Sequence, residues 1–404
     1  MIAVEQALRE ILEQVPVLGL EKVDILEALG RVLGEDVRAP RDIPPQDNSA
    51  MDGFAVNSED TLGAAAENPL FFDIVEDIPA GHVPQKIVGF AEAARIMTGA
   101  SIPRGADAVV KVEDTEMEDG RVKFRSPVRK GENVRRSGED VRMDEIVLTR
   151  GRKIRPAEIG MLASLGRSFV SVHQKPLVAV LATGNELADV DGILSPATIV
   201  SSNSYSLSAQ VIEAGGIPLI LGIAKDRKED MKDKYLQALR ADIIISSAGA
   251  SVGDYDLVKD VIQELGTDIR FWKVAMRPGR PLVFGTMGGK PIFGLPGNPV
   301  SSMISFEQFV RPSIRKMTGH TNLFRRTLQA ALEEGVDKVA GLRFFLRGVV
   351  RKMDGKYVVS MTGEQGSGIL KSMVLANGII VLPEEGTKVP RGTAVTVQVL
   401  DDSL

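Results

Sequence analysis

The chain of 404 residues contains no cysteine. That absence excludes disulfide bonds, thiolate metal sites and a cysteine nucleophile. Histidine is scarce as well, because His82, His173 and His320 are the only three and lie far apart, without the spacing of a ligand set. Any metal held by the protein is therefore expected to be a hard cation with oxygen ligands, such as Mg²⁺.

Long apolar runs are also missing. No stretch approaches the roughly 20 apolar residues of a membrane helix, and the N-terminus has no signal-peptide pattern. We therefore expect a cytoplasmic protein without a membrane partner. A formal net charge of −5 at pH 7 argues against nucleic acid as a partner. Residues 121–155 have the opposite balance, with 12 Lys/Arg and 5 Asp/Glu. This local positive charge fits either a solvated strand edge or an anion-steering surface.

The length exceeds what one hydrophobic core usually organises, and the patterning changes along the chain. Apolar spacing predicts helices over 4–15, 22–29 and 156–166, and short strands with turns over 70–150. Four domains are expected. They are an N-terminal helical linker domain (1–45 and 146–175), an inserted β domain (46–145), an α/β domain (176–320) and a C-terminal β-barrel (321–404).

The α/β domain should contain a doubly wound, mostly parallel sheet. Its strands read as continuous aliphatic runs, which is typical of strands buried on both faces. The strands are expected at 177–181, 217–223, 243–246, 271–274, 282–284 and 292–295, and the helices at 203–214, 228–240, 256–265 and 300–317.

Polar or glycine-rich segments follow five of these strands. Ligands of open parallel sheets bind outside the carboxyl ends of the strands, so these segments should share one edge. They are Thr183-Gly-Asn-Glu-Leu187, Lys225-Asp226, the small-residue loop leading to Asp254 and Asp256, Met276-Arg-Pro-Gly-Arg-Pro281 and Pro296-Gly-Asn-Pro299.

This set favours metal-assisted phosphoanhydride chemistry. Glu186, Asp226 and Asp256 could ligate Mg²⁺ while backbone amides of 248–253 hold phosphate oxygens and Lys273 and Arg277 add positive charge. Each feature also has a structural alternative. Thr-Gly-Asn-Glu could be a simple turn, and Asp226 and Asp256 could be helix caps. The aliphatic chain of Lys273 could simply pack over apolar surface, with no role in binding.

Six motifs in this order over about 250 residues resemble the molybdopterin molybdenumtransferase family, which includes MoeA and the E domain of gephyrin. The motifs are Asp47-Asn-Ser-Ala-Met-Asp-Gly-Phe-Ala55, Ile96-Met-Thr-Gly-Ala100, Thr183-Gly-Asn-Glu-Leu187, Ser251-Val-Gly-Asp-Tyr-Asp256, Met276-Arg-Pro-Gly-Arg-Pro281 and Gly294-Leu-Pro-Gly-Asn-Pro299.

The resemblance implies a homodimer that cleaves adenylylated molybdopterin with Mg²⁺ and inserts molybdate, or tungstate, into the dithiolene. It implies possible partners in the molybdopterin adenylyltransferase and in acceptor molybdoenzymes. The implied catalytic residues are Asp52, Glu186, Asp226, Asp256 and Lys273, of which Glu186, Asp226 and Asp256 are metal-associated.

The resemblance also assigns substrate contacts. Those implied for the pterin and phosphate are Thr98, Gly184, Gly249, Ser251, Gly253, Pro296, Asn298 and Pro299. Those implied for molybdate are Lys273, Arg277, Pro278, Ser301, Arg347 and Ser367.

Two positions depart from the family pattern. Ala248 stands where a second glycine is usual, and at a positive φ it would cost about 1 kcal/mol or more. Arg277 replaces a frequent lysine and changes the geometry of the charge.

Two other functions remain alternatives. One is a non-catalytic cofactor carrier or dimeric scaffold of the same fold. The other is a pterin adenylyltransferase or nucleotide hydrolase, which would leave the domains on either side of 176–318 unexplained.

Overall fold

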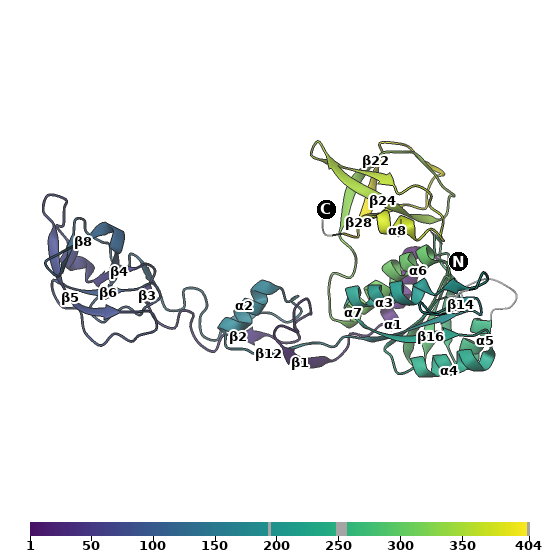
Figure 1. Cartoon of the computed structure of the whole chain (residues 1–404), viewed down its shortest axis with the longest axis horizontal. Coiled ribbons are helices and arrows are strands. Elements are labelled where there is room, and N and C mark those ends of the chain that lie inside the picture. Colours follow the sequence, from purple (N-terminus) through teal and green to yellow (C-terminus); the bar gives the residue numbers. More distant parts are fainter. Residues whose placement is uncertain (193–194, 248–256, 402–404) are drawn as a thin grey trace. The chain divides into compact units, whose positions relative to one another are not determined.

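The computed structural model describes residues 1–192, 195–247 and 257–401 (Figure 1). The chain forms two compact units. The larger comprises Met1–Gly34, Lys153–Arg155 and Phe169–Leu404, and the smaller comprises Glu35–Arg152 and Pro156–Ser168. The boundaries of the four domains expected from the sequence stay a prediction.

A six-stranded sheet forms the centre of the larger unit, in the order β16-β13-β17-β21-β20-β18. Strands β16, β13, β17 and β21 are parallel, whereas β20 is antiparallel to both β21 and β18. Five strands therefore run in one direction, which confirms the mostly parallel sheet and places their five carboxyl ends at one edge. The bounds are β13 Leu177–Thr183, β16 Ile217–Ala224, β17 Ile243–Ser247, β18 Asp268–Lys273, β20 Pro281–Met287 and β21 Lys290–Leu295.

Helices cover both faces of this sheet because alternate strand residues face opposite sides. Val178, Val180 and Ile243 face a core that also contains residues of α1, α3, α6, η3 and α7. Ala179 and Ile244 face the core of α4 and α5. The bounds are α1 Val4–Gln14, α3 Ser202–Ala214, α4 Lys228–Ala238, α5 Leu257–Glu264, α6 Pro299–Ser305, η3 Phe306–Val310 and α7 Arg311–Met317.

Two helix predictions need correction. Residues expected to form a helix over 22–29 instead form the end of β1 (Leu20–Asp24) and turns, and β1 pairs antiparallel with β12 (Phe169–His173). Leu26 and Leu29 are 73% and 55% exposed, so these two leucines do not form the buried apolar face that their helical spacing predicted. The predicted helix 300–317 is interrupted by the π-helical segment η3.

The smaller unit contains the all-β fold predicted for residues 70–150. Its six-stranded sheet has the order β7-β4-β6-β5-β9-β8 and a core with Phe54, Phe72 and Phe124. The Phe72 and Phe124 ring centroids lie 4.7 Å apart. The unit comprises β2 Val37–Arg38, β3 Asn48–Ser49, β4 Gly53–Val56, η1 Ser58–Thr61, β5 Leu70–Ile78, β6 Glu92–Ile96, β7 Ala108–Lys111, η2 Val112–Asp114, β8 Thr115–Glu118, β9 Arg121–Phe124, β10 Val134–Arg135, β11 Ile146–Leu148 and α2 Pro156–Ser164.

The C-terminal strands form a closed β-barrel, as predicted. The order is β24-β25-β22-β28-β26, and β26 pairs back with β24. The short β19 (Met276–Arg277) runs parallel to the start of β24, so the Met276–Pro281 segment is joined to the barrel by main-chain pairing. The bounds are β22 Thr327–Leu332, β23 Val336–Asp337, β24 Arg343–Met353, β25 Lys356–Met361, α8 Lys371–Leu375, β26 Gly378–Leu382, β27 Lys388–Val389 and β28 Ala394–Val399.

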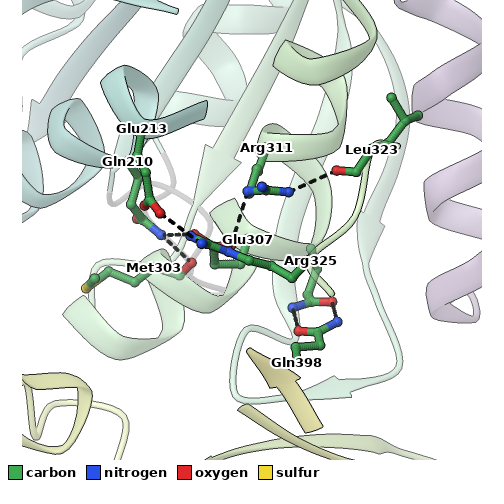
Figure 2. Close-up of polar contacts among 9 residues, drawn as sticks. Gln210, Glu213, Met303, Glu307, Arg311, Leu323, Arg325 and Gln398 are labelled. Atoms are coloured by element: carbon green, nitrogen blue, oxygen red, sulfur yellow. Dashed lines mark hydrogen bonds and ion pairs between the residues drawn. The ribbon is translucent and has the colours of Figure 1, made fainter. Parts of the chain in front are cut away.

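A buried ion-pair network lies where the chain passes from α7 to the barrel (Figure 2). Arg325 pairs with Glu307 through Nε–Oε2 at 2.9 Å and with Glu213 through Nη1–Oε1 at 2.8 Å. Arg311 donates from Nη1 to the Leu323 carbonyl at 3.0 Å. Since Glu307 is 6% exposed, the arginines supply the charge that makes its burial tolerable.

Within the described residues, no helix combines the length and apolar character needed to cross a membrane.

Candidate functional site

A cavity of about 690 Å³ opens at the carboxyl edge of the sheet, where the sequence predicted a site. It is lined by the segment after β13, the start of α3, the end of β17, the Gly297–Pro299 turn and a loop of the barrel. Of the predicted site residues, Glu186, Asn298 and Pro299 line it. A short parallel pair, β14 Leu187–Ala188 and β15 Ile199–Val200, supports this wall.

The turn after β13 fixes Asp226 relative to Glu186. Asn185 N donates to Asp226 Oδ2 at 3.0 Å, and Asp226 N donates to Asn185 Oδ1 at 3.1 Å. Gly184 has φ of 147°, and a Cβ there would lie 2.6 Å from the Glu186 carboxylate oxygens. Glycine therefore allows both the backbone conformation and the close approach of this carboxylate.

Asn203 is a site residue that the sequence reasoning missed. Its Nδ2 donates to Ser247 Oγ at 2.7 Å and to the Gly297 carbonyl at 2.8 Å, so it joins α3, β17 and the turn before α6. Its Oδ1 is buried without a hydrogen-bond partner among the described residues. The Ser-Ser-Asn sequence opening the helix was the available signal, but polar residues at a helix start are usually caps.

The Gly297–Pro299 turn is bonded to the barrel. Asn298 Nδ2 donates to Ser367 Oγ at 3.0 Å, and Val300 N donates to the Ser367 carbonyl at 3.1 Å. Gly368 and Leu370 of the same barrel loop line the cavity. Two predicted residues from different parts of the sequence, Asn298 and Ser367, are therefore in contact.

A second cavity, of about 600 Å³, carries positive charge. Arg277, Lys338 and Arg347 line it, together with Asp337 as the acidic residue. The guanidinium carbon of Arg277 and the ammonium nitrogen of Lys338 each lie 5.6 Å from the Phe344 ring centroid, within cation–π range. Pro278, which was predicted, and Gln365 and Gly366, which were not, also line this cavity. Lys338 was not predicted, because a lysine in a barrel loop is usually a solvated residue.

Arg347 is fully buried in this wall. Its Nε donates to Ser372 Oγ at 3.0 Å and its Nη2 to the Gly366 carbonyl at 3.1 Å, while Nη1 has no partner among the described residues. Burial lowers the pKa of Arg347 to about 10. A buried cation without a carboxylate is unfavourable by itself and is suited to holding an anion.

The two cavities border the same loop of the barrel. Gln365 and Gly366 line the cationic cavity, and Gly368 and Leu370 line the cavity at the sheet edge. Ser367 lies between them in sequence and holds the Gly297–Pro299 turn.

The remaining predicted residues are placed differently. Lys273, half-buried at the end of β18, and Ser301, buried in α6, line neither cavity, and Pro296 is buried below the turn. Gly249, Ser251, Gly253, Asp254 and Asp256, like Ala248, lie outside the described residues.

Asp52 and Thr98 contact each other in the smaller unit. Thr98 donates to Asp52 Oδ1 from its N at 2.7 Å and from its Oγ1 at 2.9 Å. The backbone and then the hydroxyl hydrogen bond hold the pKa of the Asp52 carboxyl below its usual range. Both side chains are exposed, so this carboxylate is ionised and accessible from solvent.

The donors available for a metal ion are hard oxygens. Glu186 and Asp226 are exposed carboxylates at the ends of the neighbouring strands β13 and β16, and both suit Mg²⁺ chemically. No group of three His, Cys, Asp or Glu side chains arranged for a metal occurs in the described part of the chain.

Comparison with known proteins gives concordant results. A family model for the MoeA N-terminal region (domain I and II) matches residues 2–166, one for a probable molybdopterin binding domain matches 179–316, and one for the MoeA C-terminal region (domain IV) matches 329–400. Molybdopterin molybdenumtransferase 2 of Mycobacterium tuberculosis is 40% identical over 383 residues, which cover 93% of this chain and 94% of that protein.

Two further relatives agree. Molybdopterin molybdenumtransferase of Staphylococcus aureus is 37% identical over 388 residues, which cover 95% of this chain and 91% of that protein. The crystal structure of a molybdopterin biosynthesis MoeA protein from Pyrococcus horikosii matches with a TM-score of 0.86 and 32% identity, covering 99% of both chains. The chain therefore belongs to the molybdopterin molybdenumtransferase (MoeA) family of transferases.

Proposed function

We propose that this protein is a molybdopterin molybdenumtransferase acting in molybdenum cofactor biosynthesis. Its substrates would be adenylylated molybdopterin and molybdate, with tungstate as the alternative oxyanion. It would cleave the adenylate in a Mg²⁺-dependent step, release AMP and insert the metal into the dithiolene. Family membership over more than nine-tenths of the chain supports this assignment.

The observation that carries the proposal is the pair of cavities along the 365–370 loop. One offers the Glu186 carboxylate and the amides of Asn203 and Asn298 at the end of a parallel sheet, and the other offers three cationic side chains. A phosphate-bearing pterin needs the first environment, and a tetrahedral oxyanion needs the second. Since the loop contributes to both, substrates bound in the two cavities would be neighbours.

At the carboxyl edge of the sheet, where Glu186 lines the cavity, Glu186, Asp226 and Asp256 would hold Mg²⁺. The bound ion would neutralise phosphate oxygens and polarise phosphorus. Gly184, Gly249, Ser251 and Gly253 would allow the backbone to approach the phosphates. The unpartnered Oδ1 of Asn203 and the turn with Pro296, Asn298 and Pro299 would orient the pterin.

In the cationic cavity, Arg277 and Arg347 would hold the oxyanion, with Pro278 and Ser367 at its border and Lys338 adding charge. Lys273 and Ser301 line neither cavity in this structure, and we propose that they act after the substrates have bound. No soft protein ligand is required, because the dithiolene supplies the sulfur atoms. This division fits a chain without cysteine.

We propose further that the enzyme is a homodimer in the cytoplasm. Asp52 and Thr98 of one subunit would complete the site of the other, where the ionised Asp52 can act on the substrate. The molybdopterin adenylyltransferase would supply the substrate, and molybdoenzymes would accept the product.

The test is AMP release from adenylylated molybdopterin with Mg²⁺ in the presence of molybdate, tungstate or neither. We expect release that depends on the oxyanion, and loss of release in Glu186→Gln and Asp226→Asn. The exposed Asp233→Asn on α4, which lines neither cavity, is the matched control. Tight binding of the pterin without release under any condition would instead support a carrier or scaffold.

A further inference from the structure

A third cavity, of about 310 Å³, shares no lining residue with the two cavities described above. Its walls come from segments that are distant in sequence. They are Leu29–Val32, Lys153, His173 and Lys175, the end of α3 around Glu213 and Gly215, and the residues Arg315, Thr318 and His320 at the end of α7. All belong to the larger unit.

The lining of this cavity is strongly cationic. Arg31, Lys153, Lys175 and Arg315 contribute four positive charges, against the one carboxylate of Glu213. That carboxylate is engaged by Arg325 at 2.8 Å. Lys153 and Lys175 are exposed and form no ion pair with the described residues, so their charges are available to a bound anion.

Three nitrogen atoms in the cavity wall are buried without a hydrogen-bond partner among the described residues. They are Arg31 Nε, Arg315 Nε and His320 Nε2. Arg31 uses its Nη2 for the Glu21 carboxylate and the His173 carbonyl, which leaves Nε unsatisfied. Buried polar groups in native proteins are nearly always paired, and the two arginine Nε–H groups can only donate, so these orphans indicate a missing acceptor.

Arg315 lacks a counter-charge. The nearby carboxylates Glu213 and Glu307 are engaged by Arg325 and Arg311 (Figure 2). No described carboxylate pairs with Arg315. Burial, and then the charges of Arg311 and Arg325, lower the pKa of Arg315 to about 10.

His320 is arranged to become a donor when an anion arrives. Its Nδ1 lies 2.9 Å from Thr318 Oγ1, whose hydroxyl donates to the Ile314 or Arg315 carbonyl, each at 3.0 Å. The threonine oxygen therefore accepts from Nδ1–H, which leaves a lone pair on Nε2 of the neutral ring. Burial, then the charges of Arg315 and Lys153, lower the pKa of His320 to about 4, against an opposing contribution from the Gly30 backbone.

We propose that this cavity binds one phosphate group, as inorganic phosphate or as a small phosphate monoester, between Arg31, Arg315, His320, Lys153 and Lys175. A tetrahedral dianion presents acceptors in several directions, which matches the orphan Nε–H donors of Arg31 and Arg315 on two separate segments, with His320 Nε2 beside them. The volume is at the lower end for ligand cavities and fits a phosphate group with few additional atoms. Binding protonates His320 Nε2, because the anion cancels the positive potential that keeps the ring neutral.

The test is calorimetric titration of the full-length protein with inorganic phosphate, with ionic strength held constant by chloride. We expect saturable binding in the wild type and at least a tenfold loss of affinity in Arg315→Met. Arg240→Met removes an exposed arginine that does not line the cavity, and it should bind phosphate as the wild type does. No phosphate binding above chloride in the wild type, or equal affinity in Arg315→Met, would overturn the proposal.

Folding and the source of the phosphate are tested separately. Arg315→Met should keep its melting temperature in phosphate-free buffer, because the guanidinium has no described partner to lose. If it does not fold, Lys153→Met and Lys175→Met at exposed positions carry the test and should each weaken binding several-fold. Glycerol phosphate binding more tightly than inorganic phosphate would identify a monoester, and the reverse order would identify the free ion.

A spectroscopic readout connects the binding to this cavity. The His320 ring resonance, assigned by its loss in His320→Gln, should report a higher pKa in saturating phosphate. Sulfate, which does not titrate in this range, should raise the pKa as well. An unchanged His320 pKa at saturation would place the bound phosphate elsewhere and overturn the assignment.

Discussion

Replacing Arg347 by methionine should separate stability from oxyanion use. Burial lowers the pKa of this arginine to about 10, against roughly 12.5 for an arginine in water. At about 1.4 kcal/mol for each pKa unit, keeping the charge in this wall costs about 3–4 kcal/mol of folding free energy. The substitution removes that cost.

The same substitution also removes two hydrogen bonds, to Ser372 Oγ and the Gly366 carbonyl. Hydrogen bonds from a charged donor contribute about 1.5 kcal/mol each at the lower end of their range, or about 3 kcal/mol together. The two effects nearly cancel. We therefore expect the free energy of unfolding of Arg347→Met to stay within about 1 kcal/mol of the wild type.

The effect on oxyanion use should be much larger. Loss of one charge-assisted hydrogen bond to molybdate, about 1.5–3 kcal/mol, raises the molybdate concentration for half-maximal AMP release roughly 10- to 150-fold. Urea unfolding and molybdate titration of AMP release measure the two quantities. Arg351→Met, exposed on the same strand, is the control. A loss of 3 kcal/mol or more in stability with an unchanged molybdate requirement would show that Arg347 is structural and does not hold the oxyanion.

Three further predictions concern other residues. Thr98→Ala should raise the pKa of Asp52 measured by NMR, because it removes the hydroxyl hydrogen bond that helps to lower this pKa. Since the pKa is lower in the folded state, the hydrogen bonds from Thr98 to Asp52 stabilise the fold above the usual Asp pKa, and this stabilisation is lost as the pH falls through the lowered pKa. An unchanged pKa would contradict this. Glu307→Gln should destabilise the protein by about 3–5 kcal/mol in urea unfolding, since it leaves Arg325 and Arg311 buried beside a neutral amide; a loss below about 1 kcal/mol would contradict it. Gly184→Ala should slow AMP release at least tenfold, because the Cβ of the new alanine would displace the Glu186 carboxylate. The control Gly355→Ala, also at a positive φ but with no neighbouring atom near the new Cβ, should only reduce stability. Equal activity in both variants would count against the site.

The strands of the larger unit were predictable because burial on both faces leaves a plain signal. Runs such as Ile243-Ile-Ile245 are aliphatic without alternation, and the structure buries all three residues between two helical layers. The same reasoning predicted a cavity at the carboxyl edge of the sheet, where one lies. The end of β18 belongs to that edge because the antiparallel β20 between β21 and β18 makes those two strands run in the same direction.

Other features depended on tertiary contacts that local patterns do not encode. Val23, Leu26 and Leu29 have helical spacing, yet pairing of β1 with β12 determined the conformation of Val23. Nothing in the local pattern distinguishes Asn203 from a helix cap or Lys338 from a solvated lysine. Their roles appear only when Ser247, Gly297 and Phe344, remote in sequence, lie beside them.

The most direct test of the proposed function is the amount of molybdenum bound to the pterin for each AMP released. The reaction would contain the purified protein, adenylylated molybdopterin, Mg²⁺ and molybdate, with metal measured by mass spectrometry in the isolated pterin product. The proposed transferase activity predicts one molybdenum per AMP and no metal transfer without adenylate cleavage. AMP release that leaves the pterin free of metal would contradict it, since the protein would then be a hydrolase and not a molybdenumtransferase.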